Sequence, residues 1–560
     1  MRDDGFFRLS PAALAFGAEI RHRQSDDGAL AGRLAALCFH AAGDGHSCLD
    51  LRRVAGVYPQ ALADIDVDAL ALSRLFAGNP LVIDADDPRT VDAAGLMVIH
   101  GSRLYLHKYW RLENALIRAL AQRLDPRELP RSGDAAEDLA VLCRHKTLAL
   151  LTGGPGTGKT TAIAGALVSW LQGFHASHGR LPQIRLCAPT GKAAARMNES
   201  WAARMPALCR HLPGDLQPAL AQNAQTLHRL LGIDPLTRRG RYADGKHLPA
   251  DLVVVDEASM LDMPMLMALL QALAPECVLV LVGDPDQLPS IEIGNVLGAL
   301  IASPADSRFA RELRNAHLQL TRNHRQAEQP GLSRFASDVL AADADAVIDG
   351  LRGNAYPGVR LRENSALSLS RIVAETAEWH ARLAQAAGVE TALSMSGERV
   401  ILTPLRQGPV GSETLNAEIG RRLGHGRNRH GEAIMVLENV PVLGLANGDV
   451  GLLWQGENGL SAHFRMPDGP LAVPMAKLPR HEPAYALTVH KAQGSEYRHV
   501  DVLLPDADGP LLSKSLLYTA ITRAKQGLTV TAGEDSLRAA LGRDIRRMNG
   551  LAALAALSAG

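Results

Sequence analysis

The sequence of 560 residues is longer than one hydrophobic core usually serves, so three or four domains are expected. Hydrophobic residues make up 47% of the chain and charged residues 21%, an ordinary balance for a globular protein. The 59 Lys and Arg residues equal the 59 Asp and Glu residues, which excludes a strong overall charge but still permits a local basic groove for nucleic acid.

The N-terminus and the cysteines indicate a cytoplasmic protein without a membrane segment. The chain begins with the acidic segment Met1–Asp4, and no long apolar run follows, so neither a signal peptide nor a membrane span is expected. The six cysteines form no C-x-x-C pair. This pattern disfavours a disulfide framework or a zinc site and is typical of a reducing compartment.

Residues 1–304 predict two units with different sequence patterns. Residues 1–130 show helical periodicity at 30–39 and short strand-like pieces near 81–83 and 103–106, and they contain no catalytic motif. Residues 131–304 alternate apolar strand-like segments with helical ones, which predicts a parallel sheet wrapped by helices. The strand-like segments of this unit are 148–152, 184–188, 252–255 and 278–282.

A second α/β unit is predicted over residues 305–427 and 481–560, with strands near 400–402 and 500–504. The segment 428–480 interrupts it with hairpin-like spacing, marked by turn residues such as Asn447-Gly448 and Asn458-Gly459. We expect a small β-barrel inserted into the second α/β unit there, and a short helix at 551–557.

A Gly-rich loop carries the clearest chemistry. The eight residues 153–160 read GGPGTGKT and lie between a predicted strand and a predicted helix, the context of a phosphate-binding loop. Backbone N–H groups of such a loop hold phosphates, the lysine reaches the β- and γ-phosphates, and the following threonine ligates Mg²⁺. The predicted nucleotide-binding residues are Gly153, Gly154, Pro155, Gly156, Thr157, Gly158, Lys159, Thr160 and Thr161.

Two further strands end in polar residues. Asp256 and Glu257 follow the apolar segment 252–255, which suits Asp256 to Mg²⁺ binding and Glu257 to activation of water. Gln287 lies in GDPDQLPS (283–290), and we expect it to sense the γ-phosphate. The predicted metal ligands are therefore Thr160 and Asp256.

The ordered motifs resemble those of superfamily 1 helicases. They are GGPGTGKT (153–160), APTGKAA (188–194), QTLHRLLG (225–232), VVVDEAS (253–259), GDPDQLPS (283–290), LTRNHR (320–325), YALTVHKAQGSE (485–496) and LYTAITRAK (517–525). The sequences of residues 436–451 and 226–232 (TLHRLLG) are similar to those of RecD proteins in particular. This resemblance implies an α/β fold with two RecA-like P-loop domains, an SH3-like inserted barrel and an α-rich N-terminal domain that docks partners.

The resemblance also implies roles for single residues. Arg325 and Arg523 would reach the ATP from the second RecA-like domain and stabilise the transferred phosphoryl group, beside the catalytic Lys159, Asp256, Glu257 and Gln287. The residues matching DNA contacts are Pro189, Thr190, Lys192, Thr226, His228, Thr488, His490 and Lys491. Hydroxyls and lysine charges suit sequence-independent phosphate contacts.

The implied activity is that of an ATP-dependent 5′-to-3′ DNA helicase. RecD proteins are motor subunits of the RecBCD helicase–nuclease (exodeoxyribonuclease V), which implies RecB, RecC and single- and double-stranded DNA as partners. It also implies a role in double-strand break repair by homologous recombination and in DNA degradation, with the nuclease site in another subunit. The alternatives are a free-standing RecD-like helicase and an ATP-switched structural subunit. The stretch 134–140 lacks the Gln that reads adenine in many such helicases, so selectivity for ATP is not predicted.

Overall fold

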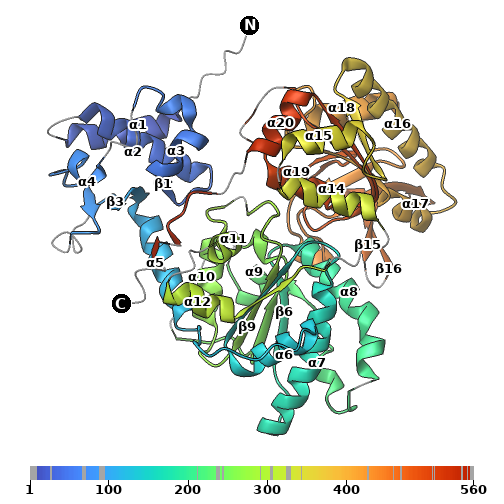
Figure 1. The fold of residues 1–560 in the computed structure, drawn as a ribbon. Helices are drawn as coiled ribbons and strands as arrows, with labels where there is room; N and C mark the ends of the chain where they lie inside the picture. The colour runs from blue at the N-terminus through green and yellow to red at the C-terminus, as the bar shows by residue number, and fades with distance from the viewer. Residues whose placement is uncertain are drawn as a thin grey trace.

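The computed structural model shows an N-terminal lobe beside two α/β units (Figure 1). It describes residues 9–24, 28–65, 71–87, 95–210, 212–234, 237, 240–242, 245–290, 292–302, 307–322, 329–341, 343–424, 428–457, 459–466, 469–506, 509, 511–543, 547–551 and 553–554. Among the described residues, no helix is both long enough and apolar enough to cross a membrane.

The N-terminal lobe packs helices against a small sheet with the strand order β1-β4-β3-β2. Its helices are α1 (Pro11–His22), α2 (Gly28–Gly43), α3 (Leu51–Val57) and α4 (Leu72–Leu75), and its strands are β1 (Cys48–Asp50), β2 (Val82–Asp84), β3 (Met97–His100) and β4 (Arg103–Leu106). Gly17 permits a close approach of α1 to α2, because a Cβ there would lie 2.3 Å from the Gly32 carbonyl oxygen. Helix α5 (His107–Ala121) leads from this lobe to the first α/β unit.

The first α/β unit contains a six-stranded sheet with the order β10-β5-β9-β8-β6-β7, in which every pairing is parallel. Its strands are β5 (Leu148–Gly153), β6 (Ile184–Ala188), β7 (Gln225–Thr226), β8 (Leu252–Val255), β9 (Val278–Gly283) and β10 (His317–Leu320). The helices of this unit are α6 (Ala135–His145), α7 (Lys159–His178), α8 (Gly191–Cys209), α9 (Leu227–Leu231), α10 (Met263–Ala272), α11 (Val296–Ile301) and α12 (Arg308–Asn315).

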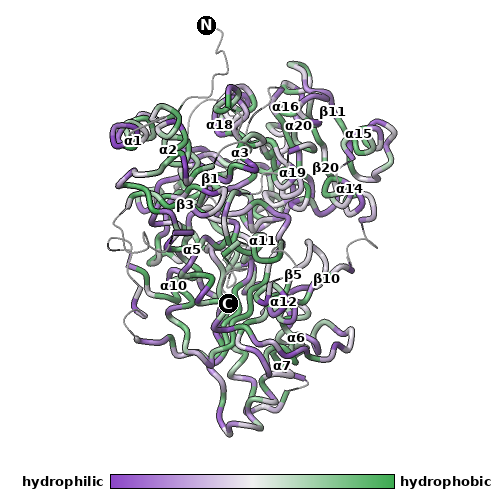
Figure 2. Tube along the Cα trace, turned by 60° about the vertical axis from the view of Figure 1, so that its left-hand side comes forward, coloured by the Kyte–Doolittle hydropathy of each residue, from purple (hydrophilic) through white to green (hydrophobic). Residues whose placement is uncertain are grey.

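Successive side chains of the central strands point to opposite faces of this sheet, and a hydrophobic core covers each face. Leu148 and Leu150 of β5 face one hydrophobic core, whereas Ala149 and Leu151 face the other. Figure 2 shows hydrophobic residues concentrated in this part of the trace. The parallel sheet predicted here is confirmed. It also includes β10, which pairs with β5 and lies beyond the boundary predicted at residue 304, so the sheet extends to Leu320.

The second α/β unit has a parallel sheet with the order β11-β20-β19-β12-β18. Its strands are β11 (Val359–Glu363), β12 (Arg399–Thr403), β18 (Ala486–Thr488), β19 (Tyr497–Leu503) and β20 (Ala524–Ala532). Its helices are α14 (Pro330–Ala341), α15 (Ala344–Arg352), α16 (Ala366–Ala384), α17 (Val389–Ser396), α18 (Ser412–Arg422), α19 (Lys514–Ile521) and α20 (Glu534–Gly542).

An antiparallel sheet with the order β16-β15-β14-β13-β17 interrupts the second unit between α18 and β18. Its strands are β13 (Ala433–Val436), β14 (Val450–Gly456), β15 (Gly459–Met466), β16 (Gly469–Pro474) and β17 (His481–Pro483). Ile434 and Val436 face a small core of the sheet itself, whereas Ala433 and Met435 join the core of the second α/β unit. We call this element the inserted sheet. Its closure into an SH3-like barrel stays a prediction.

The C-terminal segment corrects the predicted domain assignment, which gave residues 481–560 to the second α/β unit. Met548 packs in the core of the N-terminal lobe, and Leu551 and Leu554 pack in a core of the first α/β unit. The Met548 backbone N–H donates to Nδ1 of His46 (2.8 Å), and the Ser47 N–H donates to the Met548 carbonyl (3.1 Å). Most of the helix predicted at 551–557 lies outside the described residues. The segment therefore ties three parts of the chain together.

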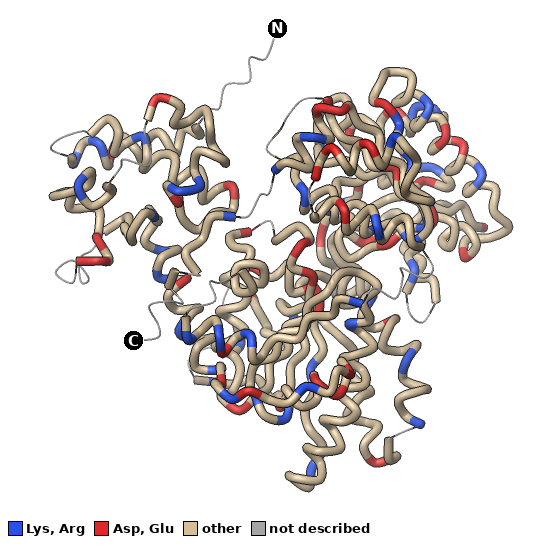
Figure 3. Tube along the Cα trace, viewed as in Figure 1, with Lys and Arg blue, Asp and Glu red and all other residues tan. Residues whose placement is uncertain are grey.

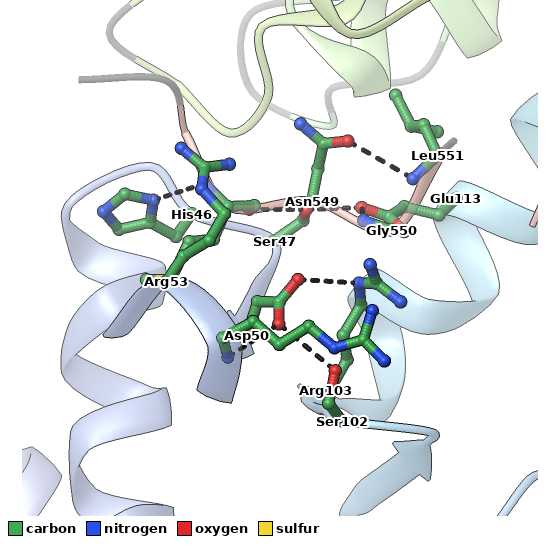
Figure 4. Close-up of polar contacts among 12 residues, drawn as sticks. His46, Ser47, Asp50, Arg53, Ser102, Arg103, Glu113, Asn549, Gly550 and Leu551 are labelled. Atoms are coloured by element: carbon green, nitrogen blue, oxygen red, sulfur yellow. Dashed lines mark hydrogen bonds and ion pairs between the residues drawn. The ribbon is translucent and has the colours of Figure 1, made fainter. Parts of the chain in front are cut away.

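A buried carboxyl group anchors this segment (Figure 4). Glu113 on α5 is fully buried and accepts hydrogen bonds from the Ser47 hydroxyl and from the Gly550 N–H (3.0 Å). The approach is close, because a Cβ at Gly550 would lie 1.7 Å from the Tyr105 hydroxyl oxygen. Burial raises the pKa of Glu113 to about 7, although the hydrogen bonds from Ser47 and Gly550 oppose the shift.

The Glu113→Gln variant should lose less stability than the wild type as the pH rises from 5 to 7. In this window the unfolded chain releases the Glu113 proton and the folded chain keeps it, so folding of the wild type weakens by on the order of 2–3 kcal/mol. Thermal unfolding at several pH values measures this, with the exposed Glu128→Gln as a control expected to follow the wild type. Parallel curves for Glu113→Gln and wild type would contradict a carboxyl group that stays protonated in the fold.

Candidate functional site

The Gly-rich loop lies at the carboxyl edge of the first sheet, between β5 and α7. Gly156 (φ 78°) and Gly158 (φ 88°) take left-handed conformations that disfavour other residues. A Cβ at Gly153 would lie 2.8 Å from the Leu320 carbonyl oxygen, so this position also requires glycine. The Lys159 ammonium donates to the carbonyl oxygens of Gly153 (2.6 Å) and Gly154 (3.0 Å), which places its charge over the loop. The loop is thus shaped to receive an anion at the start of a helix.

The carboxylate of Asp256, predicted at the end of β8, lies beside this lysine, as does Asp284 after β9, which was not predicted as a site residue. Burial and the charge of Glu257 raise the pKa of Asp256 to about 6, while the charge of Lys159 opposes the shift. Burial also raises the pKa of Asp284 to about 6, again against Lys159. Glu257 has a left-handed backbone (φ 53°), which a non-glycine residue adopts only with strain and most often at functional sites. Buried, closely spaced carboxylates of this kind favour a bound cation.

The residues present suit a magnesium nucleotide. The Gly-rich loop supplies backbone donors, Lys159 a positive charge, and Thr160 and Asp256 the oxygen ligands that Mg²⁺ prefers. Thr160 is partly accessible at the start of α7, and Thr161 is exposed and accepts from Arg204 (3.2 Å). In the described part of the chain, no group of three or more His, Cys, Asp or Glu side chains is placed to hold a metal ion.

Arg523 joins the second α/β unit to the segment 283–290 of the first. Its buried guanidinium donates to Oε1 of Gln287 (3.1 Å) and to the carbonyl oxygen of Thr519 (3.1 Å). Burial lowers the pKa of Arg523, and the negative charge of Glu257 opposes this, so the arginine lies close to the carboxylate predicted to activate water. The structure therefore brings together Arg523, Gln287 and Glu257, as expected from their motifs. Arg325 lies outside the described residues.

Other residues on the same two segments form contacts that the sequence reading did not identify. The Tyr518 hydroxyl donates to Oδ2 of Asp284 (3.0 Å). The Leu288 N–H donates to Oγ1 of Thr519 (2.8 Å), and the Gln493 amide donates to the Leu288 carbonyl (2.9 Å). All of these residues lie inside the quoted motifs, but contacts between segments about two hundred residues apart cannot be read from spacing.

The predicted strand-binding residues of the first unit follow β6 and β7. The Thr190 side chain caps α8 by accepting from the Ala193 N–H (3.2 Å), and Pro189 precedes it. The Thr226 side chain caps α9 by accepting from the Arg229 N–H (3.3 Å), and His228 is exposed on that helix. These hydroxyls are thus partly committed to helix capping.

The remaining residues predicted to contact the DNA strand differ in exposure. Burial lowers the pKa of Lys192 to about 8, and its Nζ atom is buried. In the second unit, Thr488 ends β18 and its hydroxyl accepts from the Lys491 N–H (3.4 Å). Burial also lowers the pKa of His490, with the charge of Arg547 acting in the same direction. Along the part of the trace that the structure describes, basic and acidic residues both occur in every unit (Figure 3).

Two family models match the chain. A model described as an AAA domain matches residues 137–292, and one described as the UvrD-like helicase C-terminal domain matches residues 483–531. These two segments contain the Gly-rich loop with its carboxylates and the residues from Thr488 to Arg523. The matched segments therefore meet at the contacts described above.

Curated proteins match nearly the whole chain. The RecBCD enzyme subunit RecD of Mycolicibacterium smegmatis is 35% identical over 546 residues, which cover 92% of each protein. The same subunit of Haemophilus influenzae is 30% identical over 94% of this chain and 93% of the relative. The ATP-dependent RecD2 DNA helicase of Deinococcus radiodurans is 32% identical, but the match covers 70% of this chain and 48% of the relative. The chain belongs to the family of RecD subunits of the RecBCD enzyme.

Proposed function

We propose that this chain is the ATP-dependent DNA helicase subunit of a RecBCD enzyme. The observation that carries the proposal is the buried contact between Arg523 and Gln287, which joins the second α/β unit to a segment beside the phosphate loop. A nucleotide bound between the two units would touch both of them. Its hydrolysis would therefore change how they pack against each other, which is how such a motor converts chemistry into movement.

The residues around the Gly-rich loop would have different roles in hydrolysis. The Gly-rich loop and Lys159 would hold the phosphates, and Thr160 with Asp256 would hold Mg²⁺, which neutralises charge on the transferred phosphoryl group. Glu257 would accept the proton of the attacking water. Arg523 would stabilise the charge that develops on the γ-phosphoryl oxygens, and we assign Arg325 the same role by its motif.

Strand binding would extend over the carboxyl edges of both parallel sheets. Thr190, Lys192 and Thr226 belong to the first unit, and Thr488 and Lys491 belong to the second. Contacts of hydroxyls and ammonium groups with phosphates are independent of base sequence, as a translocating protein requires. A change in the distance between the two groups during each ATP cycle would advance the strand. By resemblance, we assign movement from 5′ to 3′.

The complexed form is favoured over a free-standing helicase. The match to the RecD subunits covers 92–93% of those relatives, whereas the match to the RecD2 helicase covers 48% of it. We therefore propose RecB and RecC as partners, with the N-terminal lobe as their docking surface. The proposed cellular role is repair of double-strand breaks by homologous recombination and degradation of DNA.

Lys159→Gln should reduce ATP hydrolysis by at least about 100-fold without unfolding the chain. The variant removes a charge that the transition state requires, and it buries or exposes little apolar surface. Steady-state phosphate release measures the effect, with the exposed Lys246→Gln as a charge-matched control expected to retain full turnover. Near wild-type hydrolysis by a folded Lys159→Gln protein would show that this loop is not the hydrolytic site.

A partial duplex with a 5′ single-stranded tail should be unwound at least about tenfold faster than one with a 3′ tail. The preference follows from the proposed polarity, because the strand must enter the groove from a free end of the correct sense. Strand displacement with ATP measures it, and omission of ATP is the control. Preferential unwinding from the 3′ tail would overturn the polarity, and the absence of unwinding by the complex with RecB and RecC would overturn the motor assignment.

A further inference from the structure

The inserted sheet reaches the surface that is predicted to bind the DNA strand. Its loop between β13 and β14 lies against the first turn of α8, where a Cβ at Gly191 would sit 2.2 Å from Cβ of Ala446. No larger side chain than glycine fits at this point without moving the loop. The loop therefore covers the start of the helix that carries Lys192.

The ammonium group of Lys192, which lies under this loop, has no hydrogen-bond partner among the described residues. Its Nζ atom is buried. Asp449, at the end of the same loop, is the carboxylate whose charge acts on it and opposes the desolvation that lowers its pKa to about 8. A buried ammonium without a hydrogen-bonded partner is unfavourable, so the position favours arrival of an anion.

Asp449 also shapes the loop. Its Oδ2 accepts the Ala446 N–H (2.7 Å), and its own N–H donates to the Ala446 carbonyl (3.1 Å). The Gly448 N–H donates to the Val436 carbonyl of β13 (2.8 Å), which fixes the turn to the sheet. One carboxylate thus holds the turn 446–449 together and supplies negative charge next to Lys192.

The second predicted strand-binding lysine is held by the same sheet. Lys491 forms an ion pair of 2.5 Å with Glu482, and both side chains are partly buried. Glu482 lies on β17 and pairs with Met435 of β13, the strand that precedes the loop. Two carboxylates from neighbouring parts of one sheet therefore act on two lysines, one from each α/β unit.

We infer that the inserted sheet is a gate on the strand-binding surface, in which Asp449 and Glu482 compete with strand phosphates for Lys192 and Lys491. The inference rests on the proposed function. A phosphate reaches Lys192 only when the turn 446–449 withdraws from α8, and it reaches Lys491 only when the pair with Glu482 opens. The phosphate displaces Glu482 from Lys491 and competes with the charge of Asp449 near Lys192, so affinity for the DNA strand is lower than the lysines alone would give.

Removal of either carboxylate charge should tighten strand binding. We expect Asp449→Asn and Glu482→Gln each to lower the dissociation constant for an oligothymidylate by about three- to tenfold at low salt, because the carboxylate charge that acts on each lysine is removed. Fluorescence anisotropy without nucleotide measures this. The gain from Asp449→Asn should vanish in a Lys192→Gln background, and the gain from Glu482→Gln should vanish in a Lys491→Gln background.

The control is Glu457→Gln, which removes the same charge from an exposed turn of the inserted sheet and should leave affinity unchanged. An equal gain from Glu457→Gln would show a net-charge effect and overturn the gate, as would unchanged or weaker binding by folded Asp449→Asn and Glu482→Gln. Asparagine retains an oxygen for the Ala446 N–H, and if that variant still unfolds, Glu482→Gln decides alone. If the wild type itself binds no oligothymidylate, the proposed function fails rather than the gate.

Discussion

The buried guanidinium of Arg523 is the interaction on which the arrangement of the two α/β units depends. It donates hydrogen bonds to Gln287 of the first unit and to Thr519 of its own unit. Removing an arginine from water is costly unless its donors are satisfied, and here the acceptors come from both units. The packing of the units is thereby tied to the segment that follows β9, which lies next to the phosphate loop. We propose that a change at the Gly-rich loop is transmitted to the second unit through this contact.

Buried charged groups lie at both of the places proposed to bind ligands. Asp256 and Asp284 are buried with raised pKa values beside a single lysine, and Lys192 is a buried ammonium with no hydrogen-bonded anion. The first pair is suited to a cation with phosphates, and the lysine is suited to a phosphate alone. The two sites lie on the same parallel sheet, since β6, β8 and β9 all end at one edge. We propose that this shared edge couples the bound nucleotide to the DNA strand.

Local pattern was sufficient for the central strands and for the position of the Gly-rich loop between β5 and α7. The segments predicted at 148–152, 184–188, 252–255 and 278–282 are confirmed as β5, β6, β8 and β9, because continuous apolar runs are typical of strands buried on both faces. The sequence did not predict that β10 joins the first sheet or that Met548 enters the N-terminal lobe. Both depend on pairing between distant segments. The burial of Lys192 was also missed, since it is produced by a loop some 250 residues away, and the roles of the site residues stay predictions.

The most direct test of the account is the ATP turnover of Arg523→Lys in the presence of single-stranded DNA. Lysine keeps the positive charge but cannot span Gln287 and Thr519 with one planar group. The account predicts ATP binding within a few-fold of wild type, hydrolysis reduced by about 100-fold or more, and no strand displacement. Turnover within about threefold of wild type together with normal unwinding would contradict the claim that this arginine couples the nucleotide to movement of the two units.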